Sequence, residues 1–247
     1  MSKDDAIINP FKLPYLTNLG DIAVMISSKS DIFALCRVME VDKDKYTNLM
    51  MSRLYIHNDK KLNISILGPM IGAPYAAILL ETLIANEVKK IIFLGLCGAI
   101  STKIKIGDII VPSSSFIDEG TSKHYVNTST SYPSPIMIEK IKKSLKKINA
   151  GFHEGNIWTT DAFYRETPDK VKYFQAKDGL AVEMETSALF TISKFRDVDI
   201  GAILVVSDEL STYSWKKGFK DKRLKQGLSK TYEAITDLCK TLNSNNR

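Results

Sequence analysis

The sequence predicts an α/β fold, a single-domain three-layer sandwich whose mixed, twisted central sheet is flanked by helices on both faces. Short segments rich in Ile and Val and bounded by Gly, Pro or Asp alternate with longer segments whose apolar residues recur at helical spacing. Several of the short segments are apolar on both faces, which is typical of strands buried between two layers of helices. This alternation therefore places one sheet between helical layers.

Strands and helices are assigned in order along the chain. The predicted strands are 22–27, 53–57, 62–67, 90–96, 108–112, 154–160, 180–183 and 201–208. The predicted helices are 73–87, 134–148, 167–177 and 221–242. Pro74 suits the first turn of its helix, and Thr167 followed by Pro168 supplies a cap and a first turn. No internal repeat or low-complexity linker divides the 247 residues, so we expect one domain over 1–247.

Composition predicts an ordinary soluble globular protein, with 44% hydrophobic and 25% charged residues. The net charge is +6, but the basic runs 140–147 and 215–225 have the spacing of solvated helix faces, and no nucleic-acid-binding motif accompanies them. Segment 1–11 lacks the apolar region of a signal peptide, and the apolar run 91–100 is too short to span a bilayer. We therefore expect a cytoplasmic protein without a nucleic-acid or membrane partner.

The cysteines and histidines point away from a disulfide framework and from a metal site. Three cysteines show no paired spacing, which is typical of a reducing compartment. Three histidines are scattered along the chain without the spacing of metal ligands. These residues are Cys36, Cys97, Cys239, His57, His124 and His153.

Polar and small residues follow four of the predicted strands. The loop 67–74 contains two glycines, Gly95 and Gly98 end a buried strand, Glu183 and Glu185 end another, and Ser207 with Asp208 end a fourth. Taken singly, each is also what an ordinary turn or helix cap requires. Because ligands of α/β sheets bind at the carboxyl ends of strands, four such ends together predict a pocket.

These same stretches carry a resemblance to a known family. Segment 159–210, with "VEME" followed by "VVSD", resembles the nucleoside phosphorylase family of purine nucleoside, uridine and methylthioadenosine phosphorylases and related nucleosidases. The "G-x-CGA" pattern at 95–99 and the loop "GPMIGAP" match as well, and the likeness covers about residues 20–240. It implies a pentosyltransferase of nucleoside salvage that phosphorolyses a ribonucleoside to free base and ribose 1-phosphate. Inorganic phosphate would be the co-substrate, and no cofactor is implied.

The resemblance also implies roles for the residues of "VEME". Glu185 would hold the ribose 2′- and 3′-hydroxyls, because a carboxylate accepts two hydrogen bonds from a vicinal diol. Its negative charge would lie beside a sugar that becomes oxocarbenium-like as the glycosidic bond breaks. Met184 would pack on the sugar face, and Glu183 would lie near the base and sugar.

The base would be bound and protonated by the remaining strand ends. Phe163 would stack on the base, while Cys97, Gly98 and Ser207 would line its pocket. Asp208 would act as the general acid that protonates N7 of a leaving purine. An acid must hold its proton until it is needed, and burial favours the protonated form.

The phosphate site departs from the family pattern. The family's Gly-Asp-Pro-x-Arg loop is absent from 26–33, and Phe93 and Leu96 stand where an Arg and a Ser are usual. The remaining candidates are Lys29, Lys123 or backbone amides, and above all Ser28, Arg53, Arg165 and His124. An "EGTS-x-HY" stretch at 119–125 also occurs in a subset of the family described as uridine or nucleoside phosphorylases.

Several functions therefore stay open alongside phosphorolysis of a purine-type ribonucleoside. A nucleosidase would use water and needs no phosphate cradle. A uridine phosphorylase of the enterobacterial type would carry a Gln-x-Arg insertion after the strand with Phe163, whereas segment 163–170 runs straight into a predicted helix. A non-catalytic nucleoside-binding protein would not need Asp208. The resemblance further implies a homo-oligomer, a dimer or hexamer whose neighbours complete the site.

Overall fold

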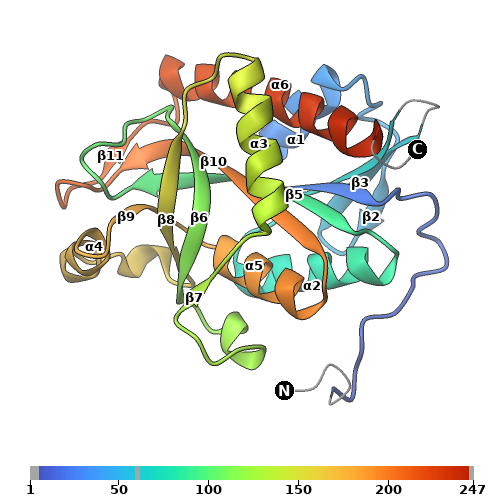
Figure 1. Ribbon diagram of the computed structural model, residues 1–247, viewed down its shortest axis with the longest axis horizontal. Coiled ribbons are helices and arrows are strands. Elements are labelled where there is room, and N and C mark those ends of the chain that lie inside the picture. Colours follow the sequence, from blue (N-terminus) through green and yellow to red (C-terminus); the bar gives the residue numbers. More distant parts are fainter. Residues whose placement is uncertain (1–5, 59–61, 245–247) are drawn as a thin grey trace.

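The computed structural model describes residues 6–58 and 62–244, which form one 11-stranded sheet with helices on both faces (Figure 1). The strands are β1 (Ile22–Ile26), β2 (Thr47–Leu49), β3 (Ser52–Asn58), β4 (Asn63–Gly68), β5 (Lys90–Ala99), β6 (Ile109–Asp118), β7 (Thr130–Ser131), β8 (His153–Thr160), β9 (Gly179–Glu183), β10 (Asp199–Glu209) and β11 (Lys216–Lys217). The helices are α1 (Lys29–Val38), α2 (Ala73–Ala85), α3 (Pro135–Lys147), α4 (Pro168–Gln175), α5 (Thr186–Phe195) and α6 (Lys222–Ser244), with 3₁₀ turns η1 (Thr121–His124) and η2 (Phe163–Arg165).

The predicted α/β sandwich is confirmed, and so is the mixed sheet. Strand β1 pairs in parallel with β4 and β5, and β5 pairs in parallel with β10, whereas β3–β4 and β6–β10 are antiparallel. Helices α1, α3 and α6 cover one face, and α2 and α5 cover the other (Figure 1). The central strands are therefore buried on both sides, which is why they read as continuous apolar runs.

Part of the sheet closes on itself, which the strands of an open sheet between two helical layers would not do. Strand β10 pairs with both β5 and β6, β6 pairs with β8, β8 with β9, and β9 returns to β5. Within this closure Gly98 of β5 lies opposite Asp208 of β10 on one side and Val182 of β9 on the other. The closure thus brings three of the four polar strand ends to one place.

Helix α1 was not assigned from the sequence, and it corrects the reading of segment 26–33 as a loop. This segment contains the end of β1 and the first turn of α1, which begins at Lys29 after the extended Ser28. Its polar start and its length of 10 residues gave little periodic signal. The predicted cap of α4 is confirmed, because Thr167 Oγ1 accepts a hydrogen bond from the Lys170 amide at 3.4 Å.

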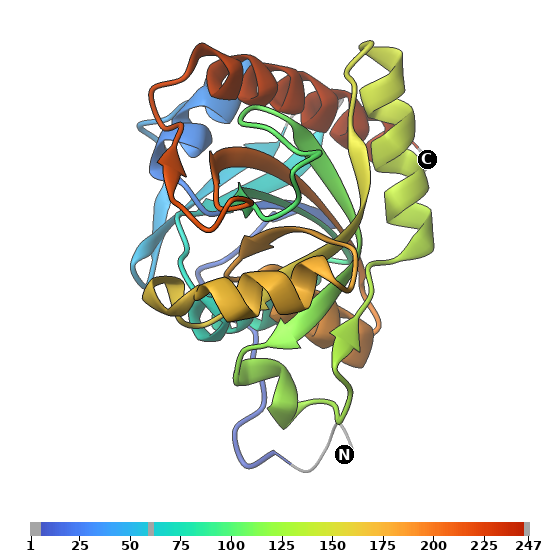
Figure 2. The same cartoon turned by 90° about the vertical axis from the view of Figure 1, so that its left-hand side faces the viewer.

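Helix α4 closes the end of the sheet beside β8 and β9, as the side view shows (Figure 2). Its Phe174 stacks on Trp158 of β8 with ring centroids 4.5 Å apart. Among the described residues, no helix combines the length and the apolar character that crossing a membrane requires. Residues 1–5 of the N-terminal segment considered above lie outside the described residues.

Candidate active site

A pocket of about 500 Å³ opens where β1, β5, β9 and β10 end. Its walls also include the loop between β4 and α2 and the turn that carries η2. Most of the residues predicted from the sequence line this one pocket: Ser28, Cys97, Gly98, Phe163, Glu183, Met184, Glu185, Ser207 and Asp208. The lining is mainly apolar, so the few carboxylates in it stand in a weakly solvating environment.

Glu185 is held in place by the loop that enters α2. The Gly72 amide donates a hydrogen bond to Glu185 Oε1 at 2.6 Å. Gly72 has φ +84°, a conformation that suits glycine and aims this amide at the carboxylate. Burial, followed by the charge of Glu183, raises the pKa of Glu185 to about 8. The Gly72 amide thus orients the carboxylate, whose remaining lone pairs can accept hydrogen bonds from a ligand.

Glu183 is engaged by the protein itself. Its Oε2 accepts bonds from the amides of Glu185 and Thr186 at 2.8 Å each, and its Oε1 accepts from Thr159 Oγ1 at 2.5 Å. Burial still raises the pKa of Glu183 despite these donors. Glu183 thus caps the start of α5 and fixes the backbone that bears Glu185, and its contact with a base stays a prediction.

Asp208 is oriented by two donors at the end of β10. Ser207 Oγ donates to Oδ1 at 2.7 Å, and Trp215 Nε1 donates to Oδ2 at 2.7 Å. The β10–β5 register shifts between Val206 and Asp208, and this irregularity re-aims the end of the strand. Ser207 Oγ also lies 3.3 Å from the Cys97 carbonyl oxygen, which ties β10 to β5.

Gly98 makes room for this arrangement. A Cβ at this position would lie 2.5 Å from Leu210 Cδ1 and 3.2 Å from Asp208 Oδ2. The glycine therefore allows Asp208 to approach β5 closely. This gives the "G-x-CGA" pattern a structural reason.

Aromatic rings surround the outer side of Asp208. Phe163 is 38% exposed and meets Trp215 in an edge-on contact with centroids 5.8 Å apart, and Trp215 meets Phe219 in the same way at 6.4 Å. The exposed ring of Phe163 has a free surface on which a planar base can stack. Phe219 lines the pocket as well.

The predicted phosphate residues are divided between the pocket and other surfaces. Ser28 and Lys29 line the pocket, whereas Arg53 lines a separate cavity and its guanidinium lies over the Tyr46 ring at 4.1 Å. Arg165 and His124 are exposed and are not among the described residues that line the pocket.

The "EGTS-x-HY" stretch has a structural role in this chain. Glu119 accepts bonds from Ser187 Oγ at 2.9 Å and from the Ser122 amide at 3.0 Å, and Tyr125 donates to Glu81 at 2.9 Å. The stretch therefore fixes η1 against α5 and α2.

Comparison with known proteins agrees with this geometry. Residues 21–238 match the phosphorylase superfamily. The chain belongs to the phosphorylase superfamily. A purine nucleoside phosphorylase, DeoD-type, from Thermoanaerobacter is 36% identical over 157 residues, covering 62% of this chain and 67% of the relative. One from Bacillus cereus is 30% identical over 200 residues, covering 78% and 85%.

The fold agrees with solved structures of the superfamily too. The crystal structure of purine nucleoside phosphorylase from Toxoplasma gondii in complex with immucillin-H superposes with a TM-score of 0.82 at 18% identity. It covers 92% of this chain and 93% of that chain. At this identity the likeness concerns the fold, and function must be argued from the site.

Three residues of this superfamily member were missed in the sequence. Trp215 lies between β10 and β11, Phe219 lies between β11 and α6, and Glu166 lies between η2 and α4. Their segments carry no periodic pattern, and Glu166 was read as part of the approach to a helix. One feature of the sequence could have indicated Trp215. It lies in a lysine-rich segment seven residues after Asp208, and a Trp is unusual in a segment that is otherwise expected to be solvated.

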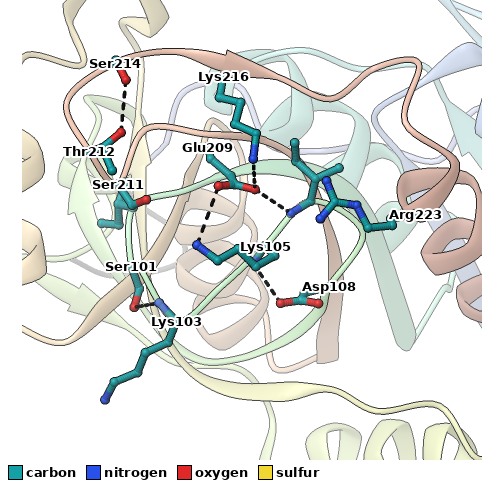
Figure 3. A network of polar contacts seen from close by, with 12 residues as sticks. Ser101, Lys103, Lys105, Asp108, Glu209, Ser211, Thr212, Ser214, Lys216 and Arg223 are labelled. Atoms are coloured by element: carbon teal, nitrogen blue, oxygen red, sulfur yellow. Dashed lines mark hydrogen bonds and ion pairs between the residues drawn. The ribbon is translucent and has the colours of Figure 1, made fainter.

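Glu209 lies at the centre of a polar network that includes Lys216, the residue after Trp215 (Figure 3). It accepts a bond from the Ile106 amide at 3.2 Å, and it pairs with Lys216 at 3.3 Å and Lys105 at 3.8 Å. Strand β11 pairs with β10, with Lys217 opposite Asp208 and Lys216 opposite Glu209. The network explains how an otherwise exposed loop presents an indole N–H at a fixed position.

We expect Trp215→Phe to lower turnover about fivefold, with little change in KM for the nucleoside. Phenylalanine keeps the ring beside Phe163 but removes the donor to Asp208, and one such bond contributes about 1 kcal/mol. Steady-state kinetics measure this, with Trp215→Leu as the control that loses both ring and donor. Unchanged turnover in Trp215→Phe would show that the indole does not orient Asp208.

Proposed function

We propose that this chain cleaves the N-glycosidic bond of a purine-type ribonucleoside by phosphorolysis, giving free base and ribose 1-phosphate. Inorganic phosphate is the co-substrate and no cofactor takes part. The proposal is carried by one observation, the convergence of Glu185, Asp208 and Phe163 on one largely apolar pocket. A diol acceptor, an acid and a stacking surface are the groups that this reaction requires.

Each residue has a definite task in the proposed reaction. Glu185, in its ionised form, accepts bonds from the ribose diol and places negative charge near the developing oxocarbenium ion. Met184 fills the space under the sugar. As the bond from C1′ to the base breaks, its electron pair moves onto the purine, and Asp208 neutralises that charge by giving a proton to N7. An oxygen of phosphate forms the new bond to C1′.

A purine base is favoured by the segment after Phe163. Helix α4 begins at Pro168, so no insertion with a Gln-x-Arg pair separates η2 from it. In the proposed reaction Asp208 supplies the proton that a purine N7 needs. Relatives named purine nucleoside phosphorylase support the same base class.

The start of α1 is the best-supported position for phosphate. Ser28 and Lys29 line the pocket, and the free amides of a helix's first turn attract anions. Ser28 Oγ and Ser30 Oγ lie 2.7 Å apart, which places two hydroxyls at this turn. The acid of the turn, Asp31, is buried and accepts a bond from Tyr232 at 2.9 Å, so it faces α6.

Hydrolysis is a second candidate function, and one observation favours it. Phe93 is fully buried in the apolar core, and Leu96 forms part of the pocket wall, so neither position supplies an anion donor. A phosphate dianion needs several charge-assisted donors when it leaves water. Water as nucleophile needs no such set, and free ribose would be the product.

We expect base release to depend on phosphate, with a KM for phosphate that rises about tenfold in Lys29→Met. Loss of a hydrogen bond from a charged donor costs about 1.5 kcal/mol or more. Lys29 is exposed, so the substitution leaves the fold unchanged. Product analysis with and without phosphate distinguishes ribose 1-phosphate from free ribose, and Arg165→Met is the matched control. Equal rates in phosphate-free buffer, with free ribose as product, would make the enzyme a hydrolase.

The proposal extends to assembly and location. We propose a cytoplasmic homo-oligomer, a dimer or hexamer, of single-domain subunits that bind a small nucleoside and neither nucleic acid nor membrane. Arg53 shares its separate cavity with Arg37 and Lys43, so it would serve phosphate only in a pocket of a neighbouring copy. Arg53→Ala should therefore weaken the dependence on phosphate if the phosphate site is shared between subunits, and it should have no such effect if the site lies within one subunit.

A further inference from the structure

Glu166 is the carboxylate of the pocket that the reaction above leaves without a task. It lines the same pocket as Asp208 and Phe163, and its side chain is half-buried. Within the described part of the chain, no hydrogen bond or ion pair engages this carboxylate. Asp208, Glu183 and Glu185 differ in this respect, because each accepts at least one bond from the protein. Glu166 is therefore available to a ligand.

The position of Glu166 is fixed by the turn that also carries the stacking ring. Its amide donates to the Phe163 carbonyl at 3.4 Å, so Glu166, directly after η2, is tied to the residue that carries the ring. A base stacked on Phe163 would thus present its edge to Glu166 and Asp208 together. Burial, followed by the charge of Asp208, raises the pKa of Glu166 to about 7. In the proposed reaction Asp208 brings the proton for N7, so Glu166 in the same pocket is the group left to accept a hydrogen bond.

Two carboxyl groups with one proton offer one donor and one acceptor. The edge of a 6-aminopurine is complementary to this pair, because N7 accepts a hydrogen bond and the 6-amino group donates one. The same edge of a 6-oxopurine has two acceptors, N7 and O6, and would leave the ionised carboxylate facing a carbonyl oxygen. An unpaired or repelled polar group in an apolar pocket is costly.

We propose that Glu166 determines base specificity: with Asp208 it forms a two-carboxyl edge that prefers a 6-aminopurine ribonucleoside over a 6-oxopurine one. This inference rests on the proposed cleavage of purine-type ribonucleosides. In it, Asp208 gives its proton to N7, and Glu166 accepts the hydrogen bond of the 6-amino group. A 6-oxopurine is bound as well only when both carboxyl groups carry a proton.

The charged groups around Glu166 come from several elements. Lys29 of α1, Glu183 and Glu185 at the β9–α5 junction, and Asp208 of β10 line the pocket with it. Arg165, Asp169 and Lys170 are its neighbours in the sequence. Lys217 lies opposite Asp208 in the β10–β11 pair, with its ammonium 4.4 Å from the Trp215 ring centroid, and Lys170 is paired with Asp118 at 2.6 Å. Of these groups, Asp208 is the one whose charge raises the pKa of Glu166.

The test compares kcat/KM for adenosine and inosine in the wild type and in Glu166→Gln. We expect the wild type to prefer adenosine at pH 8 by at least about tenfold, the effect of one mispaired polar group. An amide can turn to donate or accept, so Glu166→Gln should reduce the preference to less than about threefold. Glu139→Gln on the exposed face of α3 is the control and should keep the wild-type ratio.

The pH dependence gives a second measure with a defined sign. As pH falls below about 7, Glu166 gains a proton and becomes a donor, so the adenosine preference should shrink in the wild type and stay constant in Glu166→Gln. An equal rate for both nucleosides at pH 8, a preference for inosine, or an unchanged preference in Glu166→Gln would each overturn the inference. If neither nucleoside is cleaved, the proposed function fails. The inference is then tested by calorimetry, as the ratio of the binding constants for free adenine and free hypoxanthine in the wild type and in Glu166→Gln.

Discussion

Glu185→Gln is expected to lower turnover of a ribonucleoside by two orders of magnitude or more, about 3 kcal/mol of transition-state binding. The amide oxygen of glutamine can still accept the bond from Gly72, so the side chain should stay in position. It loses the negative charge beside the developing oxocarbenium ion and one of the two strong acceptors for the diol. Steady-state kinetics with a ribonucleoside, together with the circular dichroism spectrum, measure the effect and the integrity of the fold.

The pH profile and the stability of this variant provide its controls. Only ionised Glu185 accepts both hydroxyls, so kcat/KM of the wild type should rise with pH through about 8, and this rise should be absent in Glu185→Gln. Folding raises the pKa of Glu185 from 4.5, so wild-type stability is reduced as pH increases from 4.5 to about 8. Glu185→Gln should therefore have the higher Tm at pH 8. Near-wild-type turnover would remove Glu185 from the diol site.

Glu185 and Asp208 illustrate how much of the candidate site is predictable from the sequence. Both residues lie at or just after the end of a strand that the apolar pattern predicts to be buried. Because ligands of α/β sheets bind at the carboxyl ends of strands, the sequence predicts that both carboxylates lie at one edge of the sheet. The closure of the sheet through β9 and β10 was not predictable from the strands alone, because it depends on pairing between segments far apart in the chain. The closure nevertheless serves the same outcome, since it draws these strand ends together.

Residues on irregular segments were beyond the same reasoning. Glu166, which lines the pocket, directly follows a 3₁₀ turn, and Trp215, which donates to Asp208, lies in a loop. Neither helical nor strand periodicity indicates the direction of a side chain in such segments. Arg53 and Arg165 were proposed for their charge, but Arg53 lines a separate cavity, and Arg165 is exposed and is not among the described residues that line the pocket. Charge is visible in a sequence, whereas the place to which it is directed depends on tertiary structure.

Asp208→Asn is expected to reduce cleavage of purine nucleosides by about two to four orders of magnitude, the usual contribution of a general acid. Asparagine has the same shape, and its carbonyl oxygen can accept the bond from Trp215 Nε1. Ser207 can turn its hydroxyl hydrogen towards the Cys97 carbonyl oxygen, 3.3 Å away, and accept a bond from the new amide. The pocket should therefore keep its form and lose only the proton that the leaving base requires.

The decisive control for Asp208→Asn is a substrate that needs no protonation. A nucleoside of an N7-methylated purine already carries positive charge on the ring, so its base departs as a neutral molecule. Asp208→Asn should retain most of its activity on this substrate, within about tenfold of the wild type, while losing activity on the unmethylated nucleoside. Equal losses on both substrates would show that Asp208 is structural. Glu185→Gln should fail on both, because the oxocarbenium character of the sugar is common to the two reactions.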